Sequence, residues 1–135
     1  MAGETRGLYA AVGVGSALGA IARYLSAVAL LALFGPEFPW ATLAVNVLGS
    51  FLIGLYASMS EPDGRLQPGP LQRQFVMAGF CGGFTTFSIF SLETVLLVER
   101  GAIDLALIYV VVSLALWLGS VWTGYRIGAS LNRLW

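Results

Sequence analysis

The sequence predicts an all-α membrane protein with four transmembrane helices, because the chain is strongly apolar and contains four long apolar segments. Its 135 residues are 58% hydrophobic and 10% charged, and the mean hydropathy is +0.83. A soluble domain of this length could not bury so much apolar surface, whereas lipid would solvate it. The length predicts one domain over residues 1–135. The chain is therefore expected to form a single multi-pass membrane domain.

Each of the four segments reaches the ~20 residues that a helix needs to cross the hydrocarbon core. They cover about residues 8–34, 40–59, 71–98 and 103–131. The connections "GPEFP", "SEPDGRLQPGP" and "ERGAID" carry the turn residues that separate them. The first segment, with roughly 27 residues, is too long for a signal-peptide core and is expected to be a retained transmembrane helix.

The composition argues against several classes of function. The net charge is zero, and there is no Arg-rich run, so nucleic-acid binding is not expected. With no His and only Cys81, one chain cannot build a His/Cys metal cluster or a disulfide framework. Serine lacks its usual histidine base, and Glu93 is the only acid at membrane depth. The chain is not expected to be an enzyme.

The third segment is too long for a simple membrane helix. Its 28 residues (71–98) would span roughly 42 Å as an α-helix, against a hydrocarbon core of about 30 Å. An interruption near Gly82 and Gly83 would absorb the excess, and interrupted helices often bind ions. Alternatively, the two glycines serve close helix packing, which is common in membranes. The spacing alone leaves both interpretations open.

Small residues spaced by four indicate helices whose backbones touch. Gly15 and Gly19 form one such row, and Ser120, Gly124 and Gly128 form another. Because four helices bury little surface among themselves, the chain is also expected to form an oligomer.

Polar residues at membrane depth are candidates for function. Arg23 lies within the first segment, where it is either functional or snorkels to an interface. Thr42, Asn46 and Ser50 share one helical face, which indicates either interhelical hydrogen bonds or a polar track for a desolvated anion. On the fourth segment, Tyr109 and Ser113 begin a similar row, and Trp117 interrupts it.

An aromatic repeat follows the two glycines of the third segment. Phe87 and Phe90 are three residues apart, with Ser88 and Ser91 beside them at the same spacing. Such rings usually contact lipid or the protein core. Their electropositive edges could instead stabilise an anion weakly, and weak binding suits conduction.

The motifs together resemble those of the CrcB/Fluc family of fluoride channels. The most specific is "GGFTTFSIFSLE" (residues 82–93), and "GSALGAIARY" and "WATLAVNVLGSFLIG" add to it. The resemblance covers nearly the whole chain. It implies passive export of fluoride across a prokaryotic plasma membrane, which would lower the cytoplasmic fluoride concentration.

The resemblance also implies an assembly and a set of site residues. Two chains would pair antiparallel, each with its third helix broken near the middle of the membrane. Backbone carbonyls of Gly82 and Thr85 would hold a structural sodium ion on the dimer axis. The ion pathway is expected to involve Asn46, Phe87, Phe90, Thr42, Ser88, Tyr109, Ser113, Arg23 and Glu93.

The distribution of arginines bears on this assembly. Only Arg100 lies on one side of the predicted membrane, and the other side carries Arg6, Arg65, Arg73, Arg126 and Arg133. This bias favours one orientation of the chain. The partner is therefore either an inverted second copy or an oppositely oriented homologue.

Two other functions compete with a channel. A proton-coupled cation exporter of four helices would need an acid in its first helix, where this chain has Arg23. A scaffold subunit that transports nothing would give no reason for Asn46 beside a Phe-Ser repeat.

Overall fold

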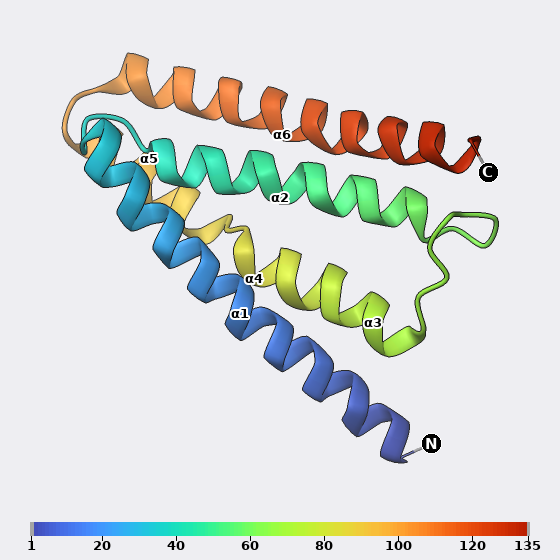
Figure 1. Ribbon diagram of the computed structural model, residues 1–135. Helices are drawn as coiled ribbons and strands as arrows, with labels where there is room; N and C mark the ends of the chain where they lie inside the picture. The colour runs from blue at the N-terminus through green and yellow to red at the C-terminus, as the bar shows by residue number, and fades with distance from the viewer. Residues whose placement is uncertain (1, 135) are drawn as a thin grey trace.

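A computed structural model describes residues 2–134, and all of its regular secondary structure within that range is helical (Figure 1). The helices are α1 (Ala2–Phe34), α2 (Trp40–Met59), α3 (Pro70–Gln74), η1 (Phe75–Cys81), α4 (Gly82–Phe84), α5 (Ser88–Glu99) and α6 (Ile103–Asn132). Four segments are long and apolar enough to cross a membrane, namely Gly3–Phe34, Trp40–Met59, Pro70–Glu99 and Ile103–Asn132. The prediction of an all-α protein with four such helices is confirmed.

The connections place the start of α1 and the end of α6 at one end of the bundle (Figure 1). The loop between α2 and α3 lies at that end, and the two short turns lie at the other. Each short turn contains a glycine with positive φ, Gly35 at 74° and Gly101 at 77°. L-residues with a side chain rarely adopt this conformation, so glycine permits the tight reversal after α1 and after α5.

The helices pack through small residues, as the spacing predicts. α2 and α6 lie side by side (Figure 1), and Gly54, Gly124 and Gly128 bring their backbones into contact. A Cβ atom on Gly124 would collide with the carbonyl of Phe51. α1 crosses η1 and α4. Because lipid competes equally for apolar side chains, such close approach is the main source of helix association.

Gly15 and Gly19 form the matching contact on α1. A Cβ atom on either would collide with the backbone of the third segment, between Phe75 and Phe84. Gly83 is equally crowded, because its own Cβ would meet the backbone of Ser16. The packing role that the sequence left open for Gly83 is therefore the one observed.

The third segment leaves the helix close to Gly82 and Gly83 but not at the glycines themselves. Both belong to α4, and Gly82 has ordinary helical angles, φ −64° and ψ −38°. Helical geometry is lost three residues later, where Thr85 is extended with φ −84° and ψ 162°, and it resumes in α5 at Ser88. Gly83 packs on Ser16 while it is still helical, and the chain departs from the helix where the side chain of Asn46 hydrogen-bonds to both backbone groups of Thr86.

Candidate functional site

The side chain of Asn46 on α2 hydrogen-bonds to the backbone of Thr86, which lies outside the helices of the third segment. The Thr86 N–H donates to Asn46 Oδ1 at 2.7 Å, and Asn46 Nδ2 donates to the Thr86 carbonyl at 2.8 Å. Asn46 is only 5% exposed. An unpaired backbone group would be costly in such an apolar setting. The amide side chain therefore stabilises the non-helical backbone between α4 and α5.

This pairing leaves two backbone carbonyls without their helical donors. In a continuous helix, the Thr86 N–H would bond to Gly82 and the Ile89 N–H to Thr85. Here the Thr86 N–H bonds to Asn46, and the Ile89 N–H donates to Thr86 Oγ1 at 3.2 Å. The carbonyls of Gly82 and Thr85 are therefore open to another electropositive partner. The family resemblance implies that the carbonyls of these same two residues hold a sodium ion.

Thr86 is a residue of the candidate site that the sequence reasoning missed. Its hydroxyl accepts from the N–H of Ile89 three residues later, as an N-cap side chain does, and lies 3.3 Å from Ser88 Oγ. A threonine just before an apolar helix is a recognised start signal. That signal could have placed the start of the second half-helix at α5.

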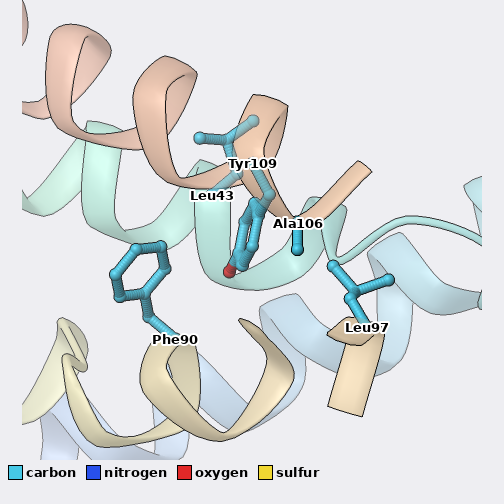
Figure 2. Close-up of a cluster of buried hydrophobic side chains, with 5 residues drawn as sticks. All are labelled: Leu43, Phe90, Leu97, Ala106 and Tyr109. Atoms are coloured by element: carbon cyan, nitrogen blue, oxygen red, sulfur yellow. The ribbon is translucent and has the colours of Figure 1, made fainter. Parts of the chain in front are cut away.

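A second polar cluster joins three helices around Glu93 of α5. Thr42 of α2 donates to Glu93 Oε1 at 2.9 Å, and Tyr109 of α6 donates to Oε2 at 2.7 Å. Tyr109 is fully buried, and its ring reaches from α6 toward α5 among Leu43, Phe90 and Ala106 (Figure 2). The structure thus brings together three of the predicted pathway residues, with the carboxylate held by two hydroxyls.

Phe90 lies at the centre of the aromatic side chains of the site. Its ring is 5.0 Å from that of Tyr109, 4.8 Å from that of Trp117 and 5.5 Å from that of Phe87, measured between centroids. Phe90 is 5% exposed, whereas Phe87 is 68% exposed. Within one chain, Phe90 is therefore part of the core, and Phe87 projects from the surface.

Two donors of α6 remain without partners in the described part of the chain. Ser113 Oγ and Trp117 Nε1 are both buried and make no hydrogen bond. The two residues are four apart and lie on one face of α6. Buried donors almost always have a partner, which is sometimes a water or an ion.

Two cavities flank this region. One, of about 300 Å³, lies between the end of α1 and α5, and Glu93, Glu37 and Arg100 are among its lining residues. The other, of about 240 Å³, is an open groove beside the non-helical segment, lined in part by Asn46, Thr86, Phe87 and Trp117. We call the first the vestibule and the second the groove.

Arg23 is not brought into these polar clusters. It is half-buried on α1 and makes no hydrogen bond or ion pair within residues 2–134. It precedes Ala27, a lining residue of the vestibule, by one helical turn. Ser88, by contrast, is exposed and contacts only the capping hydroxyl of Thr86 among the polar groups described.

The fold and site together define a small helical membrane protein with a buried polar track and an interruption in one membrane-spanning segment. The family model described as "CrcB-like protein, Camphor Resistance (CrcB)" matches residues 10–125. The chain belongs to this family. It is therefore a multi-pass membrane protein, which in bacteria lies in the cell membrane.

Named relatives align along most of the chain. "Fluoride-specific ion channel FluC 1" of Rhodopseudomonas palustris (strain BisB18) is 56% identical over 127 residues, covering 94% of this chain and 90% of the relative. "Fluoride-specific ion channel FluC 1" of Bradyrhizobium diazoefficiens is 52% identical over 127 residues, with 94% and 88% coverage. "Fluoride-specific ion channel FluC" of Opitutus terrae is 45% identical over 127 residues, with 94% and 96% coverage.

Proposed function

We propose that this protein is a fluoride channel that lets the ion leave the cell passively, and that it is not an enzyme. Relatives with up to 56% identity bear the name fluoride-specific ion channel. Hydrogen fluoride crosses membranes and ionises inside a cell in acidic surroundings. A passive pore protects such a cell, because the membrane potential expels the anion.

The observation that carries the proposal is a set of uncharged donors beside two phenylalanine rings. An asparagine amide has two N–H donors, and Asn46 uses one of them on Thr86. The hydroxyl of Ser113 is buried and has no hydrogen-bond partner among the described residues. Fluoride holds its water tightly, so several donors must replace that shell together. The ring edges of Phe87 and Phe90 add stabilisation weak enough for the ion to leave.

Charged residues act beside this path rather than in it. An ionised carboxylate repels an anion, so Glu93 serves to orient the hydroxyls of Thr42 and Tyr109. Arg23, one turn from the vestibule, carries a positive charge that raises the local concentration of anions. We therefore assign Glu93, Thr42, Tyr109 and Arg23 supporting roles beside the ion pathway.

The open carbonyls of Gly82 and Thr85 suit a sodium ion. Their usual donors are bonded to Asn46 and to the Thr86 hydroxyl, and Gly82 lies on the surface of the chain. Carbonyl oxygens prefer hard cations, and two carbonyls from each of two chains would supply four ligands. The ion would hold the interruption open near the middle of the membrane and bridge two chains.

An antiparallel dimer accounts for the exposed surface at the interruption. Non-helical backbone at membrane depth needs cover from protein or a water-filled cavity, yet Phe87 is 68% exposed in one chain. A second chain would cover this surface. The arginine bias leaves two partners, an inverted second copy or an oppositely oriented homologue, and we favour the second copy.

A flux assay tests the proposed function. Purified protein is reconstituted into vesicles loaded with fluoride, and efflux is followed with a fluoride electrode without a proton gradient. Release is expected under these conditions, and equal loading with chloride should give little release. Release that requires a proton gradient would indicate a coupled carrier, and no release would indicate a scaffold subunit.

A further inference from the structure

The side chain of Trp117 offers a buried donor that no group within residues 2–134 satisfies. Its indole nitrogen is buried and has no hydrogen-bond partner within the described chain. An indole N–H only donates and has no lone pair to offer a cation. A buried donor of this kind calls for a partner from outside the chain. An anion is a suitable partner, and a metal ion is not.

The position of Trp117 places this donor beside the ion path. Trp117 lines the groove together with Asn46, Thr86 and Phe87. It lies one turn beyond Ser113, whose buried hydroxyl is also unpartnered. Asn46 has a second N–H that no described residue accepts. Asn46 and Trp117, which carry two of these uncharged donors, therefore line the same groove next to the non-helical segment, and Ser113 lies one turn along α6 from Trp117.

The ring of Phe90 holds the indole in place. The two rings meet edge to face, with centroids 4.8 Å apart and planes at 72°. Such pairs have a preferred geometry and restrict the rotation of both side chains. The orientation of the indole ring is therefore restrained by packing, as a selective site requires of the side chains that carry its donors.

We infer that the Trp117 indole N–H is an anion donor of the pathway, following Ser113 in the track on α6. The inference rests on the proposed fluoride function and names a further subsite of it. Trp117, which interrupts the polar row in the sequence, thus continues it chemically. Because the nitrogen lies below the surface of the groove in one chain, a small side-chain movement must open the groove to it when an anion passes.

Indole N–H resonances test the inference directly. Protein labelled with ¹⁵N-tryptophan in micelles is titrated with sodium fluoride, and with sodium chloride at equal ionic strength. The chain has four tryptophans, Trp40, Trp117, Trp122 and Trp135. Fluoride is expected to shift the Trp117 resonance far more than the others, and chloride should leave it in place. A Trp117 resonance that fluoride does not move would overturn the inference.

A matched pair of variants gives a second reading. Trp117→Phe keeps a ring against Phe90 but deletes the donor, and Trp122→Phe makes the same change at an exposed position of α6. A hydrogen bond to an ion corresponds to about a tenfold effect or more, so Trp117→Phe should slow fluoride efflux about tenfold. Trp122→Phe should conduct normally. Normal efflux through folded Trp117→Phe would overturn the inference while leaving the proposed function intact.

Failure of the two proposals can be told apart. If Trp117→Phe does not fold, the resonance is assigned by elimination from Trp40→Phe, Trp122→Phe and Trp135→Phe, and the titration of the unaltered protein decides. If the unaltered protein does not conduct fluoride, the proposed function fails. A fluoride-specific shift at Trp117 would still support the subsite, and its absence would reject it.

Discussion

At the scale of single residues, Asn46 has two tasks that one substitution can separate. Its amide pairs with both backbone groups of Thr86 and keeps one N–H free. Asn46→Asp replaces that amide nitrogen with oxygen, so a carboxylate would face the Thr86 carbonyl. We expect the free energy of unfolding to fall by about 1–3 kcal/mol and fluoride conduction to stop even in the folded fraction. Denaturant unfolding measures the first effect, and fluoride efflux normalised to folded protein measures the second.

Asn132 is the matched control for Asn46→Asp. It also makes a pair of backbone contacts, accepting from the Arg65 N–H at 2.9 Å and donating to the Ser58 carbonyl at 2.9 Å. It lies at the end of α6, away from the groove. Asn132→Asp should loosen the α2–α3 loop and leave conduction intact. Normal fluoride efflux per folded molecule in Asn46→Asp would show that Asn46 only stabilises the fold.

Phe90 tests the role of the ring edges. Phe90→Ile keeps an apolar side chain of similar bulk but removes the electropositive edge, so fluoride efflux should fall by about tenfold or more while the dimer persists. Phe34→Ile, at an exposed position near the end of α1, is the control. If Phe90 is only a core residue, Phe90→Ile will conduct normally once folded, and the account of the ring edges will be wrong.

At the scale of elements, the non-helical segment between α4 and α5 links the sodium proposal to activity. Replacing sodium with a large organic cation should reduce fluoride efflux, because the carbonyls of Gly82 and Thr85 would no longer have a cation to bind. Thr85→Val removes only a hydroxyl that donates to the Cys81 carbonyl at 2.9 Å and keeps the backbone carbonyl. Its efflux should therefore keep the same dependence on sodium. Equal efflux with and without sodium in the unaltered protein would contradict the sodium proposal.

The elements also show how much of the fold could be predicted from the sequence. The four apolar segments and the rows of small residues were predictable, because hydropathy and the helical repeat are local properties. The third segment was expected to leave the helix near Gly82 and Gly83, and its first extended residue is Thr85, three residues after Gly82. The choice between packing and a break depends on which residue of α1 meets Gly83, and that contact with Ser16 is not local.

The candidate site was also predictable only in part. Thr42, Asn46 and Tyr109 became candidates for the ion pathway because they are polar residues at membrane depth that share a helical face with other polar residues. Thr42 and Tyr109 both hydrogen-bond to Glu93. This convergence depends on how α2, α5 and α6 are rotated about their axes and shifted along them. Spacing within one helix cannot supply that information. Arg23 was chosen by depth alone, and it makes no polar contact with the cluster among the described residues.

At the scale of the whole molecule, two glycines test whether a second chain covers the interruption. Gly82 and Gly119 are both exposed, and a Cβ atom on either would meet no atom of its own chain closer than 3.8 Å. Within one chain, both should tolerate Gly→Leu. A dimer centred on the interruption predicts that Gly82→Leu disrupts the dimer and abolishes efflux, whereas Gly119→Leu does neither. Light scattering in detergent and efflux measure these outcomes, and equal behaviour of the two variants would contradict the proposed interface.

The reversal potential of the current in a planar bilayer tests passive fluoride conduction most directly. Protein is incorporated with a tenfold fluoride gradient at equal pH on both sides. A passive, selective pore predicts a reversal potential near the fluoride equilibrium value, about 59 mV for the tenfold gradient. Neither a pH gradient nor a chloride gradient should move it. A reversal potential that follows the pH gradient, or the absence of any fluoride current, would contradict the account.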